Sequence, residues 1–156
     1  MKIVSQNKMF GGAQRVYEHE SVSCSCTMRL GVFLPPQVLD EPNRKLPTLI
    51  WLSGLTCTEQ NFITKAGAQK MAAELGVILV APDTSPRGEG VADDPEGAYD
   101  FGLGAGFYVN ATQAPYAEHY QMYQYIVDEL PELLAAALPV DADRLGIFGH
   151  SMGGHG

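Results

Sequence analysis

The alternation of hydrophobic and polar positions in the first part of the chain predicts the beginning of a β-sheet. Three β-leaning runs are separated by a Gly-Gly pair and by a serine- and cysteine-rich segment; they cover residues 3–10, 14–22 and 27–34. In the third run Met28, Leu30 and Val32 alternate with other residues, so we expect one face of this strand to point inward. The runs predict a small antiparallel start to the sheet, followed by a polar, proline-punctuated loop up to residue 47.

Uninterrupted apolar runs mark further strands, because strands covered by helices on both faces lack the alternation. These runs cover residues 48–52, 77–81 and 145–148. Helices are expected between the first two runs, over residues 59–65 and 67–75, and Gly76 is expected to end the second helix. The order of strand, helix and strand predicts an α/β fold whose sheet is mostly parallel, with antiparallel N-terminal strands.

Another helix is expected before the last of these strands. Apolar residues with helical spacing predict it over residues 118–130; they are Tyr120, Tyr123, Ile126, Val127 and Leu130. Pro131 either kinks this helix or opens a second one that runs to Leu138. Residues 139–144 are expected to turn the chain back into the last strand.

The segment from residue 83 to residue 114 is rich in Gly, Asp and Pro and is too long for a plain connection. Loops of this length are usually functional or disordered, and we expect a functional one. Its Phe101, Phe107 and Tyr108 either wall a pocket or simply pin the loop to the domain. The glycines of residues 102–106 resemble a dinucleotide fingerprint only superficially, because no clear apolar strand leads into them.

Composition narrows the class of protein. A hydrophobic content of 46% with 18% charged residues predicts a packed core rather than disorder. A net charge of −8 with ten basic residues argues against nucleic acid or an anionic membrane surface as partner. No run is long enough to span a bilayer, and the N-terminus lacks the apolar region of a signal peptide.

The cysteines predict a reducing compartment. There are three, an odd number that does not suit a disulfide framework, so we expect a cytoplasmic protein. Cys24 and Cys26 would share one face of a strand, and no further metal ligands lie nearby at suitable spacing. We therefore expect them to be small buried or half-buried side chains and expect no metal site.

The pentapeptide Gly149-His150-Ser151-Met152-Gly153 has the pattern Gly-x-Ser-x-Gly and directly follows an apolar run. This is the pattern of a nucleophile elbow, in which a sharp strand-to-helix turn lifts the serine hydroxyl out of the sheet. The alternative is a glycine-rich turn that happens to contain a serine. The preceding strand, the second glycine pair and the absence of a following proline favour Ser151 as a catalytic nucleophile.

Two backbone N–H groups are candidates for an oxyanion hole. In hydrolases of this architecture one donor comes from the loop after an earlier strand and the other from the residue after the nucleophile. By position these donors are Leu55 and Met152. Taken alone, the segment from Ser53 to Thr56 is equally well interpreted as an ordinary strand-to-helix turn.

The other members of a catalytic triad are not evident in this sequence. Such hydrolases carry the serine first, then the acid, then the histidine, and the five residues after Ser151 contain no acid. His150 and His155 are poorly placed to act as its base. We expect residues 1–156 to be the N-terminal part of a single α/β-hydrolase domain, with the acid and histidine beyond Gly156 and the elbow strand at a sheet edge. The alternative is an incomplete fold or interaction fragment, and we expect this stretch by itself to be inactive.

Four parts of the chain carry a resemblance to a known family: the elbow and the segments SGLTCTEQNF, VAPDTSPRG and GAGFYVNATQAPY. On these motifs the chain resembles the S-formylglutathione hydrolase (esterase D) family along its whole length. The resemblance implies an α/β-hydrolase that cleaves the thioester S-formylglutathione to glutathione and formate in cytoplasmic formaldehyde detoxification. It implies Ser151 as nucleophile, Leu55 and Met152 as oxyanion donors, no metal or organic cofactor, and a small-molecule partner; it leaves a homodimer open. A general short-acyl carboxylesterase is the alternative enzyme.

Two more positions gain meaning from the resemblance. Cys57 falls where the family has a cysteine near the active site, and similar members are often sensitive to thiol reagents. We interpret it as a small core residue whose modification blocks the site sterically, rather than as a nucleophile. Tyr116 stands where many relatives have tryptophan, which bears on the shape of the pocket but not on the reaction.

Overall fold

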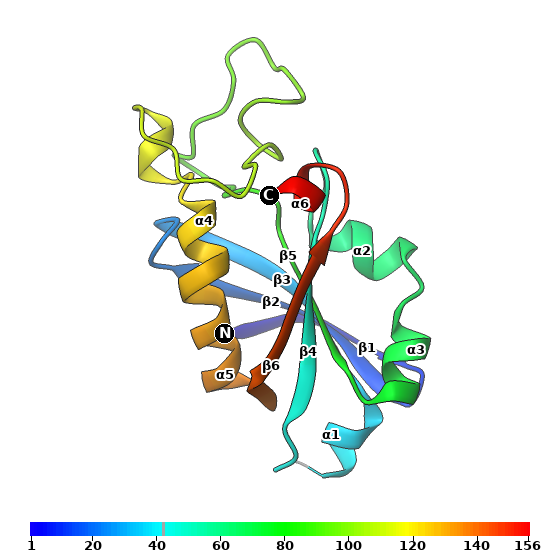
Figure 1. Cartoon of the computed structure of the whole chain (residues 1–156). Helices are drawn as coiled ribbons and strands as arrows, with labels where there is room; N and C mark the ends of the chain where they lie inside the picture. The colour runs from blue at the N-terminus through cyan, green and yellow to red at the C-terminus, as the bar shows by residue number, and fades with distance from the viewer. Residues whose placement is uncertain (42) are drawn as a thin grey trace.

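The computed structural model describes residues 1–41 and 43–156 and has a single six-stranded sheet flanked by helices (Figure 1). The strand order is β1-β2-β3-β5-β4-β6. The strands are β1 (Lys2–Met9), β2 (Gly12–Ser21), β3 (Cys26–Leu34), β4 (Leu46–Leu52), β5 (Ile78–Pro82) and β6 (Val140–Gly149). Neighbours from β1 to β5 pair antiparallel, whereas β4 pairs parallel with both β5 and β6. The α/β class with antiparallel N-terminal strands is therefore confirmed, and β6 lies at a sheet edge as expected. The sheet is mixed rather than mostly parallel, because three of its five strand pairings are antiparallel.

Helices cover both faces of the parallel strands (Figure 1). Helices α2 (Glu59–Lys65) and α3 (Gln69–Leu75) lie on one side, and α4 (Met122–Gln124), the π-helical η2 (Tyr125–Glu129) and α5 (Leu130–Ala137) lie on the other. The short helices are α1 (Pro36–Asp40), the 3-10 helix η1 (Tyr116–Glu118) and α6 (Met152–His155). The loop expected after β3 therefore contains α1, which a proline at its first turn favours because this position needs no N–H donor.

The helix expected over residues 118–130 begins later, at Met122, and runs to Ala137 without a break between α4, η2 and α5. The N–H of Leu130 bonds to the carbonyl of Tyr125, which gives the wider π turn. Pro131 follows in the first turn of α5. Because proline has no N–H to donate, the wider turn just before it lets the helix continue into α5.

Strand β6 begins at Val140, so the turn predicted over residues 139–144 is wrong. Val140 pairs with Leu46, and the next pair joins Leu145 to Thr48, so β6 carries extra residues between the two pairs. The extra residues form a bulge, in which Arg144 Nε donates to Asp141 Oδ2 over 2.6 Å. The polar run that resembles a turn in the sequence is therefore an irregularity within the strand.

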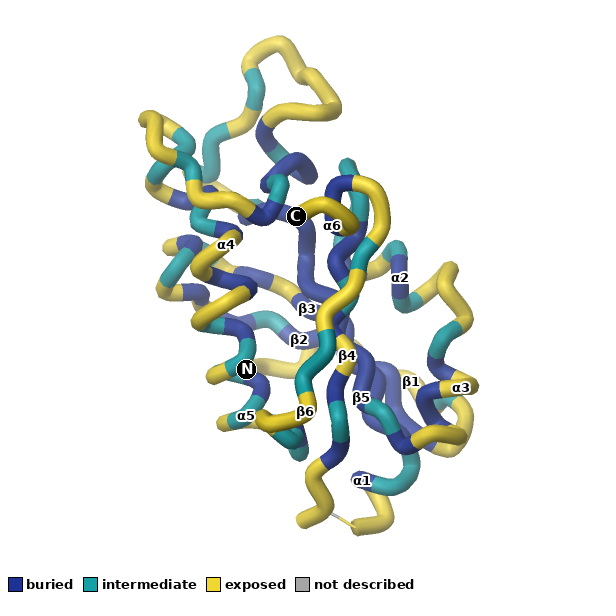
Figure 2. The backbone as a smooth tube through the Cα atoms, viewed as in Figure 1, coloured by how far each residue is buried: buried dark blue, intermediate teal, exposed yellow. Residues whose placement is uncertain are grey.

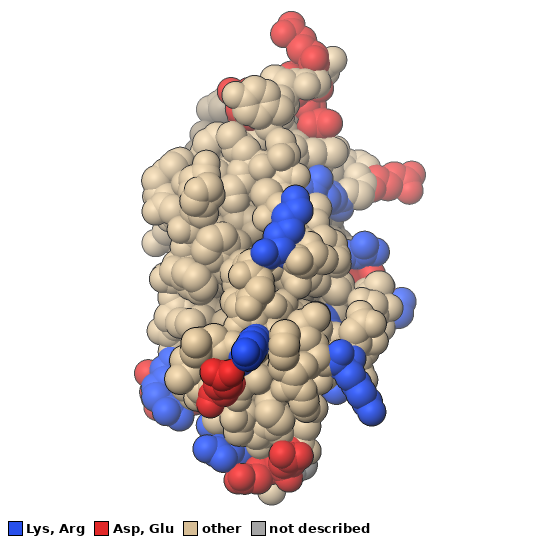
Figure 3. All heavy atoms as spheres, turned by 90° about the vertical axis from the view of Figure 1, so that its right-hand side faces the viewer, with Lys and Arg blue, Asp and Glu red and all other residues tan. Residues whose placement is uncertain are grey.

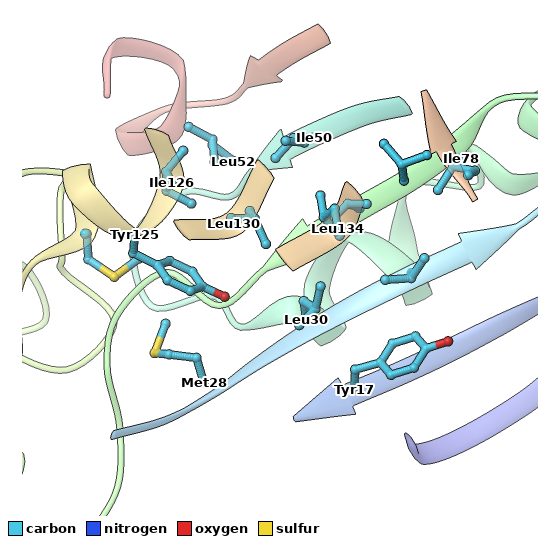
Figure 4. Packing of buried hydrophobic residues seen from close by; sticks show 14 of the residues in the cluster. Tyr17, Met28, Leu30, Ile50, Leu52, Ile78, Tyr125, Ile126, Leu130 and Leu134 are labelled. Atoms are coloured by element: carbon cyan, nitrogen blue, oxygen red, sulfur yellow. The ribbon is translucent and has the colours of Figure 1, made fainter. Parts of the chain in front are cut away.

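The main core lies between the sheet and the helices α4, η2 and α5. Tyr125, Leu130 and Leu134 of these helices pack against Met28, Leu30 and other strand residues (Figure 4). Burying each such side chain contributes about 1.5–3 kcal/mol. This core holds the helices against the strands that lead toward Ser151.

The opposite face of β3 is buried as well, which corrects the prediction of a single inward face. Phe33 belongs to a second cluster with residues of α2, α3 and β5. Gly31 lies so close to α2 that an added Cβ would be 2.7 Å from Ile63 Cγ2. Figure 2 shows the buried central strands between more exposed edges.

Cys24 and Cys26 do not share a strand face. Cys24 is buried in the turn before β3, and Cys26 is the half-buried first residue of that strand. The predicted burial is confirmed, but the predicted common face is wrong because the strand begins two residues later than Cys24.

Charges are dispersed on the face that carries α2 and α3. Figure 3 shows its Lys and Arg side chains singly or beside Asp and Glu, without a continuous basic patch among the described residues. Within residues 1–41 and 43–156 no helix combines the length and the apolar composition needed to cross a bilayer.

Candidate active site

Ser151 lies at a sharp turn between β6 and α6. Its φ of 54° and ψ of −121° are outside the regions that non-glycine residues usually occupy, and such backbone strain costs about 1–3 kcal/mol. The His150 N–H donates to the carbonyl of Leu52 over 3.2 Å, and the Gly154 N–H donates to the carbonyl of Ser151 over 2.9 Å. These bonds tie the turn to β4 on one side and to α6 on the other. The Ser151 residue itself is exposed.

The two glycines of the pentapeptide are required by close packing at this turn. A Cβ on Gly149 would overlap the carbonyl oxygen of Gly153 and lie 2.7 Å from the carbonyl oxygen of Leu52. A Cβ on Gly153 would overlap the Leu52 carbonyl and lie 2.8 Å from Leu52 Cβ. Because the nearest obstacles are backbone atoms of Leu52 at the end of β4 and of Gly153 in α6, only glycine fits either position. The two glycines of the Gly-x-Ser-x-Gly pattern thus stand at the two positions where the turn packs most closely against the end of β4.

The loop after β4 lies directly against Ser151. A Cβ on Gly54 would be 3.2 Å from Ser151 Cβ and 3.7 Å from its Oγ. The Cys57 N–H donates to the Gly54 carbonyl over 3.4 Å and closes a β-turn with Leu55 and Thr56 at its centre. Thr56 has a φ of 65°, and a β-branched residue at positive φ is a genuine outlier. The chain therefore holds a strained turn beside the strained serine.

Leu55 and Met152 both present N–H groups without a protein acceptor in the part of the chain that the structure describes. Leu55 follows Gly54, on which an added Cβ would lie 3.2 Å from Ser151 Cβ, and Met152 follows Ser151 itself. An oxyanion hole needs two such N–H groups near the attacking hydroxyl, so Leu55 and Met152 remain the predicted donors.

Neither His150 nor His155 has an imidazole hydrogen bond to the Ser151 hydroxyl in the described part of the chain. His150 and His155 are exposed, and the His155 ring lies 6.1 Å from the Phe107 ring, measured between centroids. The imidazole hydrogen bonds in the described residues belong to His19 and His119 instead. The described chain also contains no cluster of three or more residues able to hold a metal ion.

Cys57 has a half-buried side chain, and its backbone carbonyl accepts two hydrogen bonds from beyond β5. One comes from the Thr84 hydroxyl and the other from Arg87 Nη2 over 3.2 Å. Arg87 Nε also donates to both carboxylate oxygens of Asp83, over 3.1 and 2.9 Å. Burial raises the pKa of the Asp83 carboxyl, and the bond from Arg87 opposes that rise. Sequence analysis missed this group; its only signal is an acid and an arginine four residues apart just after a buried strand.

Some aromatic residues of the long loop line a pocket, and another pins the loop to the domain. Phe101, Phe107 and Tyr116 line a cavity of about 160 Å³. Tyr108 is buried and donates its hydroxyl to the Ser53 carbonyl over 2.8 Å, so it pins the loop to the end of β4. Burial raises the pKa of Tyr108 far above its usual value.

Tyr116, the residue that replaces tryptophan, packs edge-on against Phe101 at 4.9 Å between ring centroids. Its hydroxyl donates to the Asp93 carbonyl over 3.1 Å. The glycines of residues 102–106 lie in the same loop, where the described residues 83–115 contain no helix or regular strand. They therefore lack the strand–turn–helix context of a dinucleotide site.

Comparison with known proteins places the chain among esterases. The family model described as "Putative esterase" matches residues 21–156. S-formylglutathione hydrolase of Mus musculus is 55% identical over 156 residues, which are 100% of this chain and 54% of that protein. The Rattus norvegicus S-formylglutathione hydrolase is 54% identical with the same coverage. The chain thus spans about half the length of the curated relatives it matches.

A solved structure agrees with this relationship. An S-formylglutathione hydrolase from Agrobacterium tumefaciens matches with a TM-score of 0.95 and 47% sequence identity, covering 100% of this chain and 55% of that one. The likeness therefore extends over the whole of this chain. The chain therefore has the α/β-hydrolase fold and belongs to the esterase family.

Proposed function

We propose that this chain carries the nucleophile and the oxyanion hole of a serine hydrolase that cleaves S-formylglutathione to glutathione and formate. The observation that carries the proposal is the contact between the Ser151 turn and the Gly54 loop, which brings the N-H-bearing Leu55 segment against the serine. The match of this whole chain to about half of two S-formylglutathione hydrolases, at 55% and 54% identity, supports the substrate.

The reaction proceeds in two acyl-transfer steps. A histidine takes the proton of the Ser151 hydroxyl as its oxygen attacks the formyl carbon of the thioester. The N–H groups of Leu55 and Met152 hold the resulting oxyanion until the carbon–sulfur bond breaks and glutathione leaves with the proton from the histidine. Water then attacks the formyl-serine ester and releases formate. The chemistry requires no metal or organic cofactor.

We assign the acid and the histidine of the triad to sequence that follows Gly156 in the complete protein. The support is that this chain corresponds to 54% of its Mus musculus relative, and that the imidazole hydrogen bonds of the described residues belong to His19 and His119 and not to His150 or His155. The chain is then the N-terminal part of one α/β-hydrolase domain. We expect the stretch of residues 1–156 to hydrolyse nothing on its own.

The same proposal places the enzyme in formaldehyde removal in the cytoplasm. The described cysteines Cys24, Cys26 and Cys57 are free thiols, which suits a reducing compartment. A homodimer stays a prediction that size-exclusion chromatography with light scattering would test.

A general short-acyl carboxylesterase is the second candidate. The apolar cavity of about 160 Å³ near Phe107 and Tyr116 favours it, because such a cavity could accept a small acyl or alkyl group. A higher kcat/KM on a short alkyl ester than on S-formylglutathione would select this function over the thioesterase.

The decisive experiment replaces the nucleophile in the complete protein. Ser151→Ala is expected to lower kcat for S-formylglutathione by at least about 10³-fold, since the covalent route is removed. Ser5→Ala, at an exposed position on β1, is the matched control and is expected to leave kcat unchanged. Near-normal turnover by Ser151→Ala would refute the proposal, and retained activity in Cys57→Ser would separate the serine from the nearby thiol.

A further inference from the structure

The turn that carries Leu55 is held by bonds from segments far away in the sequence. On its N-terminal side the Ser53 carbonyl accepts from the Tyr108 hydroxyl over 2.8 Å. At its centre the Thr56 N–H donates to the Gly104 carbonyl over 2.9 Å. On its C-terminal side the Cys57 carbonyl accepts from Thr84 and Arg87. The turn is therefore braced at both ends and in the middle.

Bracing is needed because the turn is strained. Thr56 has a φ of 65°, a conformation that threonine does not choose when it is free. If the turn relaxed, the two peptide planes that flank Thr56 would rotate, and the neighbouring Gly54–Leu55 peptide, which carries the Leu55 N–H, would be displaced with them. Strained backbone of this kind persists only where its surroundings over-determine it.

We propose that Arg87 is a positioning residue for the reaction: it clamps the Cys57 carbonyl and so keeps the Leu55 N–H directed at the oxyanion. This inference rests on the proposed function of Ser151. Arg87 acts through the turn and does not touch the substrate.

The guanidinium geometry explains why an arginine stands here. Its Nε donates to both oxygens of Asp83, while Nη2 donates to the Cys57 carbonyl over 3.2 Å. One rigid, planar group thus joins the start of the long loop to the turn after β4. A lysine ammonium is a single point and lacks the fork that serves both acceptors in fixed directions.

Asp83 is itself well anchored, so the clamp has a firm base. Its carboxylate accepts the N–H of Thr84 over 2.6 Å, and its own N–H donates to the Arg29 carbonyl of β3 over 3.0 Å. Asp83 is buried, with 5% of its surface exposed. The sheet therefore holds Asp83, Asp83 orients Arg87, and Arg87 holds the turn.

Thr84 adds an independent donor to the same carbonyl. Its residue is fully buried, and its methyl and hydroxyl groups can be separated by substitution. Thr84→Val removes the hydroxyl and keeps the shape, whereas Thr84→Ser keeps the hydroxyl. This pair tests the clamped carbonyl without changing any charge.

The test uses the complete protein with Arg87→Met and Arg87→Lys, and with Arg29→Met as the matched control. Arg29 lines the same surface hollow as Arg87 and its replacement loses the same charge, but its side chain pairs with Glu18 and not with the turn. The substitution keeps the Arg29 backbone carbonyl, which is the group that accepts from Asp83. Displacing a catalytic group by about 1 Å can cost about 10²-fold in rate. We expect Arg87→Met to lower kcat by about 10- to 100-fold while KM stays within about threefold of the parent value. Arg87→Lys should lower kcat less than Arg87→Met but not reach the parent value. Arg29→Met should keep the parent kcat.

Two ligands separate positioning from general loosening of the fold. Phenylboronic acid forms a tetrahedral serine adduct that needs the oxyanion donors, so its affinity should fall in parallel with kcat. S-methylglutathione, a thioether that cannot react, should keep its affinity within about threefold. Thermal melting of each variant identifies those that fold; if Arg87→Met does not, Thr84→Val with its Thr84→Ser rescue carries the test.

The outcomes distinguish this inference from the proposed function. If Ser151→Ala abolishes turnover while Arg87→Met and Thr84→Val match Arg29→Met in kcat and boronate affinity, the positioning role is overturned and the serine mechanism stands. Equal weakening of the boronate and the thioether would also overturn it, because the effect would then be on the whole pocket. Turnover that survives Ser151→Ala would remove both proposals.

Discussion

Replacing Gly54 by alanine is the sharpest test of the contact between the turn after β4 and the serine. Gly54 does not have a positive φ, so alanine can adopt its backbone conformation. The new Cβ would lie 3.2 Å from Ser151 Cβ, 3.5 Å from the His150 carbonyl oxygen and 3.7 Å from Ser151 Oγ. The three atoms nearest to the new methyl group therefore belong to the serine turn.

The expected effect follows from these distances. A Cβ contact of 3.2 Å is tighter than nine in ten real ones, so the serine or the turn must move by a few tenths of an ångström. Since a displacement of about 1 Å can cost about 10²-fold in rate, we expect kcat/KM to fall by about tenfold, or about 1.4 kcal/mol. Stability should change by no more than about 1 kcal/mol, because the lower entropy of the unfolded chain offsets the contact.

Gly67→Ala provides the matched control with the opposite outcome. Gly67 has a φ of 65° and no atom within 4 Å of an added Cβ. Alanine there should cost about 1 kcal/mol of folding free energy through backbone strain and leave kcat/KM unchanged. The assay is S-formylglutathione hydrolysis by the complete protein alongside urea denaturation. A Gly54→Ala enzyme with the activity of the parent would refute the geometry on which the site rests.

Two further predictions concern groups that support the site and the core. Tyr108→Phe leaves the buried Ser53 carbonyl without its 2.8 Å donor and should cost about 1–3 kcal/mol in urea denaturation; equal stability would show that the bond is dispensable. His19 is buried, its Nε2 lies 3.1 Å from the Tyr125 hydroxyl and its Nδ1 3.8 Å from Glu129, and burial lowers its pKa below the usual 6.5. The unfolded chain then binds the proton more readily than the folded one, so the free energy of unfolding should be smaller at pH 5.5 than at pH 7. His19→Gln should flatten this pH dependence, and an unchanged dependence in that variant would contradict the prediction.

Most strands and helices could be predicted from local patterns. The predicted runs and the observed strands β1 to β5 agree within a few residues, because glycines and prolines mark their ends and the apolar runs mark their burial. The exceptions have a physical cause. Val140 is drawn into β6 by pairing with Leu46, although the polar residues that follow look like a turn, and the second face of β3 is buried only because α2 covers it.

Some parts of the candidate site could likewise be predicted from local patterns, and others could not. Ser151 and its glycines are recognisable in the sequence because a sharp turn beside a strand restricts which residues fit within five positions. The hydrogen bonds from Arg87 and Tyr108 to the turn after β4 cannot be recognised in the sequence, because they join residues that are 30 and 55 positions apart. No local pattern reports such a separation.

The amino-acid sequence by itself thus determined the α/β class, the order of its elements and the position of the strained serine, since these depend on backbone sterics and short-range periodicity. Only the tertiary structure decided which segments lie against Ser151 and what holds the Thr56 conformation. The physical reason is that a strained turn and an unpaired N–H are maintained by contacts between distant segments, and those contacts exist only once the sheet has brought the ends of β4, β5 and β6 together.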